Sequence, residues 1–284
     1  MVRDHRLIPA YYINLEKSKE RRKYIESLSI ENNLEMYRIN ACNGQAMDEE
    51  QVRRVYCPQE GERPLTRSEV ACFLSHREAW KRIAALESGH GAVFEDDVHF
   101  SRSLARLLTD ASWLTGDMHV VKLEKAARRH IELGATGAMV GDVRIRRLYS
   151  LHIGCGGYIL SRDCAAALLE RTETFSQPVD HAIFDPATTV IPDFMLWQAA
   201  PAVCIQQQFS SELFLPEAAE RSSLEAGRVE SKLVLRARRH PVRHFLGKAW
   251  TELKRPFARA AHYLWKKITC PVAGRSWVKL KYNP

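Results

Sequence analysis

The chain lacks any long apolar run, and no stretch approaches the roughly 18 uninterrupted apolar residues that a membrane-spanning helix needs. Its first 15 residues mix charged with apolar side chains, so they lack the block layout of a signal peptide. The seven cysteines are scattered, odd in number and without a CxxC pair, which argues against a disulfide framework and a zinc ribbon. We therefore expect a protein that stays in the reducing cytoplasm, with its cysteines packed as small apolar side chains.

Glycine and proline are also infrequent, with 14 and 12 among 284 residues, which excludes collagen-like and low-complexity chains. The hydrophobic fraction of 45% is that of an ordinary globular protein. A chain of this length and composition can bury a sizeable core in one large or two small domains.

Negative charge is scarce in the last part of the chain. Residues 221–284 hold 16 Lys and Arg but only 3 Asp and Glu, whereas residues 1–220 hold 26 basic and 31 acidic side chains. Within 242–268, apolar residues recur in steps of three and four, which predicts an amphipathic helix that Pro256 kinks or splits. We therefore divide the chain into a catalytic domain, 1–220, and a basic amphipathic helical tail, 221–284. This tail either meets an anionic partner, nucleic acid or a membrane surface, or packs on the body.

Segments typical of strands alternate with segments typical of helices along the first 210 residues. Ser18, Thr66 and Ser161 precede three of the expected helices, as N-cap residues do. In chain order we predict a strand at 7–15, a helix at 19–32, a strand at 34–39, mostly loop at 43–64, a helix at 66–87, strands at 92–97 and 118–123, paired strands at 143–149 and 153–160, a helix at 161–171 and a strand at 202–207. This alternation predicts an α/β sheet covered by helices.

Three consecutive carboxylates, Glu95, Asp96 and Asp97, follow a short apolar run. On an extended strand end, Glu95 and Asp97 point to the same side because side chains alternate. A bound cation would relieve the repulsion between these carboxylates, and oxygen ligands favour hard ions such as Mg²⁺ or Mn²⁺. On spacing alone, a solvated acidic turn remains the alternative.

Several short blocks stand in a fixed order between residues 7 and 210: Ile13-Asn14-Leu15, Arg21-Arg22, 41–44, 65–81, 93–97, 121–123, 156–161 and Pro178-Val179-Asp180. In order and spacing they resemble glycosyltransferase family 25, the lipooligosaccharide sugar transferases of bacteria and the related collagen galactosyltransferases. The chain departs from the family pattern at Ser68, where glycine is usual, and at Phe94, where an aliphatic residue is usual.

The resemblance implies a GT-A-like fold, that is, a Rossmann-type mixed sheet flanked by helices. It also implies a nucleotide-sugar donor, usually UDP-galactose, and inversion at the anomeric carbon. In such an enzyme, Mn²⁺ or Mg²⁺ held by Glu95 and Asp97 would act as a Lewis acid on the charge of the leaving UDP. Asp96 would then bind the ribose or the donor sugar.

Five further residues are candidates for binding the donor. Asn14 ends the first predicted strand, where it would meet the uracil or the ribose. Arg21 and Arg22 lie in the first turn of the next helix and would reach a diphosphate, although a solvated basic face is the alternative. Gly156 and Gly157 resemble a glycine-rich turn at which the backbone approaches the donor sugar, or else form a tight hairpin.

An inverting displacement needs a base that takes the proton of the acceptor hydroxyl. Asp180 is the first candidate, with a helix N-cap as its alternative role, and Asp193 and Glu124 are weaker candidates. His76 stands beside Ser75 inside a family block, which makes it a catalytic candidate, although a lone helical histidine is more often structural.

The sequence thus predicts an inverting, metal-dependent glycosyltransferase that moves a hexose, first of all galactose, onto a lipooligosaccharide core. Its partners would be the UDP-sugar, a lipid-linked acceptor and an anionic membrane surface met by 242–268, at the inner face of the cytoplasmic membrane. The alternatives are transfer of glucose or another hexose, a metal-dependent protein that binds nucleic acid or cleaves phosphodiesters, and a catalytically silent scaffold. The regular apolar stripe of the tail disfavours nucleic acid, and the retained carboxylates argue against the scaffold.

Overall fold

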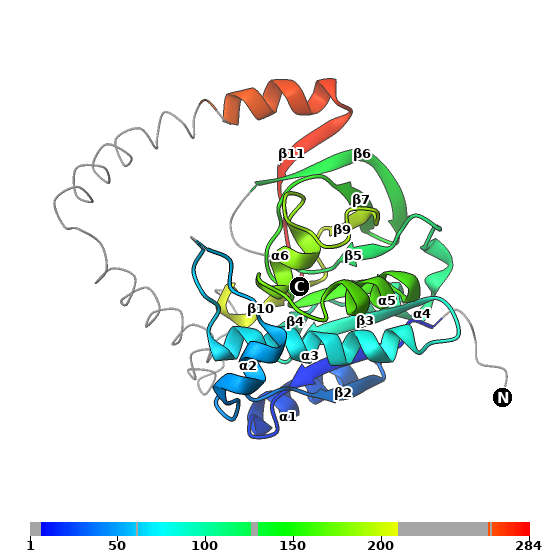
Figure 1. Cartoon of the computed structure of the whole chain (residues 1–284). Helices are drawn as coiled ribbons and strands as arrows, with labels where there is room; N and C mark the ends of the chain where they lie inside the picture. Colours follow the sequence, from blue (N-terminus) through cyan, green and yellow to red (C-terminus); the bar gives the residue numbers. More distant parts are fainter. Residues whose placement is uncertain (1–6, 61, 126–129, 210–260, 262) are drawn as a thin grey trace.

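The computed structural model describes residues 7–60, 62–125, 130–209, 261 and 263–284. Within these residues, nine strands form one mixed sheet in the order β11-β6-β7-β9-β5-β8-β3-β1-β2 (Figure 1). They are β1 Ala10–Asn14, β2 Met36–Asn40, β3 His90–Glu95, β5 Val120–Lys122, β6 His130–Val140, β7 Val143–Leu148, β8 Gly157–Ser161, β9 Leu196–Ala200 and β11 Arg275–Lys279. The short strands β4 Val98–Phe100 and β10 Cys204–Gln206 pair separately. The predicted α/β class with a mixed sheet is confirmed.

Helices cover both faces of this sheet, because alternating strand residues are buried on opposite sides. Tyr11 and Ile13 belong to one hydrophobic core, whereas Ala10 and Tyr12 belong to the other. The first core receives helices α3 Arg67–Ala84, α5 Arg162–Arg171 and α6 Val179–Phe184, and the second receives α1 Lys19–Glu31 and α4 Ser103–Thr109. The sheet is therefore the middle layer between two apolar cores.

Two of the three predicted helix caps are confirmed. The Thr66 hydroxyl accepts from the Glu69 backbone N–H and the Glu69 carboxylate accepts from the Thr66 N–H, which is the complete capping box at the start of α3. Ser161 likewise caps α5. Ser18 was expected to cap α1 but makes no side-chain cap hydrogen bond within the described part of the chain.

Other expectations need correction. The segments 143–149 and 153–160 do not pair: β7 lies between β6 and β9, and β8 lies between β3 and β5. Strand β6, which was not predicted from the sequence, forms a hairpin with β7 and pairs along one edge of it, while β9 pairs along the other. The region 43–64 is mostly loop, as predicted, but it contains helix α2 Glu49–Val55, which begins at a capping box of Asp48 and Gln51.

The predicted tail helix over 242–268 lies mostly outside the described residues. Residues 263–272 are helical and lead into β11, which pairs antiparallel with β6 at the edge of the main sheet (Figure 1). On this helix Leu264, Trp265 and Ile268 are all more than 60% exposed. None of the helices that the structure describes has both the length and the apolar character needed to cross a membrane.

Strand order brings the predicted polar residues to one edge. Strands β1 and β3 run parallel and side by side, with Ile13 opposite Glu95. Asn14 and the three carboxylates therefore lie at the carboxyl ends of adjacent parallel strands. In open α/β sheets this edge is where ligands bind.

Candidate active site

A cavity of about 540 Å³ opens at the carboxyl ends of β1 and β3. The amino-terminal half of α3 forms one wall, and the loop before β8 and the start of α6 form another. The lining residues come from 13–21, 41–45, 68–76, 95–97, 153–155, 178–180 and 206–209. Segments far apart in the sequence thus meet around one polar hollow.

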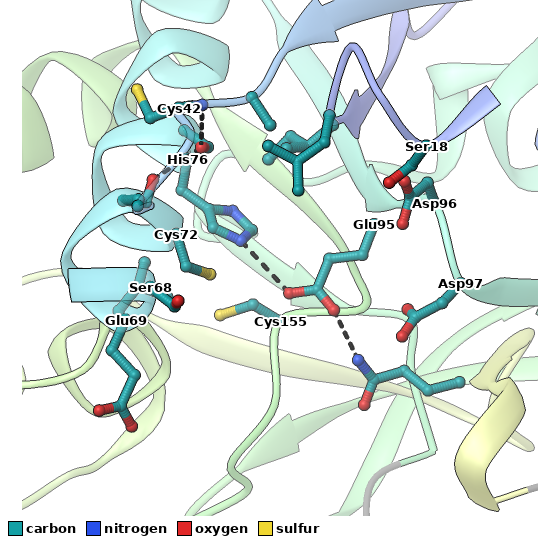
Figure 2. Close-up of a pocket in the computed structure, with 18 of the residues that line it drawn as sticks. Ser18, Cys42, Ser68, Glu69, Cys72, His76, Glu95, Asp96, Asp97 and Cys155 are labelled. Atoms are coloured by element: carbon teal, nitrogen blue, oxygen red, sulfur yellow. Dashed lines mark hydrogen bonds and ion pairs between the residues drawn. The ribbon is translucent and has the colours of Figure 1, made fainter. Parts of the chain in front are cut away.

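The three carboxylates lie where β3 ends in a turn. The strand stops at Glu95, and Asp96 and Asp97 form the turn to β4, so the strand alternation assumed from the sequence does not reach Asp97. The Asp97 carboxylate nevertheless points back toward Glu95, whereas Asp96 points toward Ser18 (Figure 2). Glu95 and Asp97 therefore share one space, as predicted, through the turn rather than the strand.

Burial makes this pair costly to ionise. The pKa of Asp97 is raised above its usual range, first by burial and then by the charge of Glu95. The pKa of Glu95 is also raised, again chiefly by burial and then by the charge of Asp96. Among the described residues, Asp97 Oδ1 is buried without a hydrogen-bond partner. A cation at this point would satisfy that oxygen and offset the repulsion.

Asp96 has its own partners and is thereby separated from the pair. The Asn14 side-chain amide donates to Asp96 Oδ2 at 2.7 Å, and Arg21 lies 3.2 Å from Asp96 Oδ1. Arg38 in turn donates to Asn14 Oδ1 at 3.1 Å and fixes its amide. This chain of contacts holds the turn after β3 against the start of α1.

His76 is fully buried on α3 and faces Glu95. Its Nδ1 lies 2.9 Å from the Tyr158 hydroxyl, and this hydroxyl accepts from Trp80 Nε1 at 2.8 Å. Its Nε2 lies 3.5 Å from Glu95 Oε1 (Figure 2). Burial lowers the pKa of His76 to about 4, so the imidazole is neutral at pH 7. Gln206 Nε2 donates to the other Glu95 oxygen at 2.5 Å.

Two carboxylates and a lysine hold the glycine loop before β8. The Gly154 N–H donates to Asp180 Oδ2 at 3.0 Å, and the Gly156 N–H donates to Glu124 Oε2 at 2.9 Å. Lys122, buried beneath, donates to the Gly154 carbonyl oxygen. A Cβ on Gly156 would lie 2.9 Å from Gln206 Cγ and 3.0 Å from Glu124 Cδ, so both side chains would have to shift to admit it. Burial raises the pKa of Glu124 to about 7.

The structure brings most of the predicted site residues together, but not all of them. The residues lining the cavity include six predicted ones: Arg21, His76, Glu95, Asp96, Asp97 and Asp180. Behind the lining lie Asn14, Glu124, Gly156 and Gly157, which support it. Arg22 is not brought to the cavity and pairs with Glu26, and Asp193 pairs with Arg171 at the surface.

Sequence reasoning missed several residues of the cavity and its support. Cys72, Cys155 and Gln206 line the cavity, and Lys122 supports its loop. Cys72 stands four residues before His76, which places both on one face of α3, and this spacing was the available signal. Cys155, Gln206 and Lys122 gave no such signal, because only the tertiary fold brings their neighbours to them.

The donor set fits a hard divalent ion at Glu95 and Asp97. Both carboxylates are partly exposed at one point of the cavity, and Asp97 Oδ1 is itself buried and has no partner among the described residues. Oxygen ligands of this kind suit Mg²⁺ or Mn²⁺.

Comparison with known proteins connects the chain to one family. The family model described as "Glycosyltransferase family 25 (LPS biosynthesis protein)" matches residues 7–183. Procollagen galactosyltransferase 1-A of Xenopus laevis is 29% identical over 171 residues, 56% of this chain and 27% of that protein. The lacto-N-neotetraose biosynthesis glycosyltransferase LgtE of Neisseria meningitidis serogroup B is 28% identical over 207 residues, 69% of this chain and 73% of that protein.

The matches to the collagen enzymes are partial. Human procollagen galactosyltransferase 2 is 32% identical over 105 residues, 34% of this chain and 17% of that protein. The chain thus matches about a quarter or less of the length of these relatives. Among solved structures, the inositol-1-phosphate CTP transferase of T. maritima is similar at 11% identity and a TM-score of 0.36, covering 74% of this chain and 93% of that one.

Proposed function

Because the chain belongs to glycosyltransferase family 25 and is a glycosyltransferase, we propose that it transfers galactose from UDP-galactose, with inversion, onto a lipooligosaccharide core. The names of its relatives support a galactosyl donor and an oligosaccharide acceptor. The observation that carries the proposal is the carboxylate pair of Glu95 and Asp97 in the cavity, with Asp97 Oδ1 buried and without a hydrogen-bond partner among the described residues. Transfer of glucose or another hexose would use the same machinery.

Glu95 and Asp97 are the residues that would hold Mn²⁺ or Mg²⁺. Such an ion supplies Lewis-acid stabilisation of the negative charge on a departing nucleoside diphosphate. Arg21, about 29% exposed at the cavity, would contact the diphosphate, while Asp96 and Asn14 hold Arg21 and the turn in place. Gln206 orients Glu95 through its 2.5 Å hydrogen bond. These residues bind and orient the donor before reaction.

Asp180 is the proposed base for the acceptor hydroxyl. It lines the cavity, and its two oxygens accept from the backbone N–H groups of Gly154 and His181, each at 3.0 Å. These donors hold the carboxylate in a fixed orientation at the cavity, where it can take the proton of an acceptor hydroxyl. A carboxylate oxygen has two lone pairs, so each oxygen can still accept from a substrate hydroxyl.

A membrane-anchored acceptor agrees with the described end of the tail. Leu264, Trp265 and Ile268 form an exposed apolar row on one face of the helix, with the exposed Lys267 beside it, while Lys266 pairs with Glu132 of β6. Apolar residues flanked by lysines are typical of helices that lie on anionic membranes. We propose that this helix contacts the cytoplasmic face of the membrane that carries the acceptor.

A hydrolysis and binding screen tests the proposal. UDP-galactose, UDP-glucose and the UDP-N-acetylhexosamines are incubated with the full chain, with Mn²⁺, with Mg²⁺ and with a chelator. We expect UDP release from UDP-galactose that requires the divalent ion. Release that is undiminished by the chelator would remove the metal role, and binding of none of the four donors would overturn the proposed function.

A further inference from the structure

Three side chains from two elements bring one metal-binding atom each to the wall of the cavity behind Glu95. Cys72 and His76 stand four residues apart on α3, so they share one helical face, and Glu95 ends β3. The Cys72 sulfur, a His76 ring nitrogen and a Glu95 oxygen all lie within 4.8 Å of one another. Figure 2 shows the three side chains directed toward the same space.

The distance between His76 Nε2 and Glu95 Oε1 fits two ligands of one metal ion better than it fits a hydrogen bond. His76 is 1% exposed, and in the part of the chain that the structure describes its Nε2 has no hydrogen-bond partner. The carboxylate oxygen Glu95 Oε1 lies 3.5 Å from His76 Nε2, which is beyond the usual distance of an N–H···O hydrogen bond. Two ligands bound at about 2.0–2.1 Å to a tetrahedral ion are roughly 3.4 Å apart.

Neighbouring groups fix the orientation of both ligands. The Tyr158 hydroxyl, held by Trp80, meets His76 Nδ1, and this leaves Nε2 directed at Glu95. Gln206 binds the far oxygen of Glu95 and leaves Oε1 directed at His76. Metal-bound histidines and carboxylates in proteins are held by outer partners of this kind.

We propose that Cys72 Sγ, His76 Nε2 and Glu95 Oε1 bind Zn²⁺, with a fourth position open to the cavity. A thiolate, an imidazole and a carboxylate are the ligands that zinc prefers, whereas Mn²⁺ and Mg²⁺ prefer oxygen alone. Binding forms the bond from sulfur to zinc and releases the thiol proton of Cys72 to solvent. The ion thus occupies a site different from that proposed for Mn²⁺ or Mg²⁺, although both use Glu95.

Sharing Glu95 makes zinc an inhibitor of sugar transfer. With Glu95 Oε1 on zinc, this carboxylate is withdrawn from Asp97, and the hard ion loses one of its two proposed ligands. This consequence rests on the proposed function, whereas the zinc site itself does not.

Spectroscopy with Co²⁺ as the probe tests the site without any activity assay. The full chain is stripped of metal with a chelator and titrated with Co²⁺, which absorbs in the near ultraviolet when a thiolate binds it. We expect one equivalent of Co²⁺ to give this band and Zn²⁺ to remove it, while excess Mn²⁺ weakens the binding of Co²⁺ through the shared Glu95 but gives no such band itself. A titration without saturable absorption would overturn the proposal.

Two serine variants locate the thiolate. Cys72→Ser should abolish the Co²⁺ band and weaken Zn²⁺ binding at least tenfold, while the matched control Cys57→Ser, at an exposed thiol outside this cavity, should keep both. Glu95→Gln should weaken the affinity and retain the band, since the thiolate remains. An unchanged band in Cys72→Ser would overturn the proposal.

The outcomes separate this site from the proposed function. A Cys72-dependent band in a protein that hydrolyses no UDP-sugar would overturn the sugar-transfer proposal and keep the zinc site. Mn²⁺-dependent hydrolysis in a protein that shows no such band would overturn the zinc site and keep the sugar-transfer proposal.

Discussion

Asp97 is a half-buried carboxylate whose buried Oδ1 lacks a partner among the described residues, and it lies next to the half-buried Glu95. If it binds the divalent ion, Asp97→Ala should reduce turnover by about 10²–10³-fold, since an ion of this kind contributes several kcal/mol to the stability of the transition state. The variant should remain folded, because removing a carboxylate that is costly to ionise relieves repulsion.

Steady-state assays with UDP-galactose and Mn²⁺, together with thermal unfolding, check this prediction. Asp142→Ala, which removes an exposed carboxylate from the hairpin between β6 and β7, is the control. Full activity in a folded Asp97→Ala protein would remove the metal role from this turn.

Asp180 has two possible roles, as a base and as a support for Gly154, and Asp180→Asn separates them. The amide can still accept from one backbone N–H, but it cannot take a proton. We expect kcat to fall about 10²–10⁴-fold with little change in donor KM. A changed donor KM with an intact kcat would show that Asp180 only positions the loop. Both constants come from initial rates at saturating acceptor.

His152 gives stability a dependence on pH. It is buried with its Nδ1 2.7 Å from Gln198 Oε1, and burial lowers its pKa well below the usual value. Below about pH 6.5 the unfolded chain therefore binds a proton here that the folded protein does not, so stability falls as pH falls. From pH 7.5 to 5.5 this residue should cost roughly 1 kcal/mol.

Urea unfolding at the two pH values, on wild type and His152→Gln, measures this contribution. Glutamine can donate to Gln198 but does not titrate, so the variant should lose about 1 kcal/mol less than wild type over this interval. Equal losses in both proteins would contradict the assignment.

At the level of single residues, the sequence identified side chains whose chemistry is visible in their type. Glu95, Asp97 and Asp180 were recognised because carboxylates in a family block point to chemistry. Lys122 and Gln206 were not, because each gains its partner across the fold: Lys122 meets Gly154, and Gln206 meets Glu95, 111 residues earlier.

At the level of elements, β8 begins with a glycine enclosed by neighbouring strands. A Cβ on Gly157 would lie 2.4 Å from Cys204 Sγ and 3.1 Å from Phe94 Cδ1. Gly157→Ala should therefore lower the free energy of unfolding by about 1–3 kcal/mol, as overpacking does. Gly116→Ala, where no described atom lies within 4 Å of the new Cβ, should change it by less than about 0.5 kcal/mol.

Chemical denaturation of both variants checks this prediction. A second substitution, Cys204→Ala, should restore part of the stability lost in Gly157→Ala, because it removes the sulfur that the new methyl group meets. Additive losses in the double variant would contradict the contact as the cause.

The elements that sequence analysis located were those with strong local signals. Helix α3 has a complete capping box and an apolar stripe, and its start was predicted to within a residue. Strand pairing could not be read this way: 143–149 and 153–160 are close in sequence, yet β6 and β9 flank β7. Pairing depends on which distant strand reaches an edge, and local pattern does not carry that information.

At the level of the whole molecule, the described tail helix presents apolar side chains to the solvent. We expect a triple variant, Leu264→Ser, Trp265→Ser and Ile268→Ser, to bind anionic vesicles at least tenfold more weakly than wild type, because it removes the apolar area that would enter the membrane interface.

Flotation with vesicles containing phosphatidylglycerol measures this binding. Ile30→Ser is the matched control, since Ile30 is 79% exposed on α1, outside the tail. Undiminished flotation of the triple variant would exclude this face as the membrane contact.

Strand β11 also constrains how the molecule is made. Its Arg275 meets Glu132 of β6 across 143 positions of sequence, so at 5–20 residues per second the ribosome delivers β11 roughly 7–30 s after its partner. During that interval the backbone N–H and C=O groups along the outer edge of β6 are unpaired, and they can form hydrogen bonds with strands of other nascent chains. Soluble yield should therefore depend on translation speed and on chaperones that shield this edge until the last strand arrives.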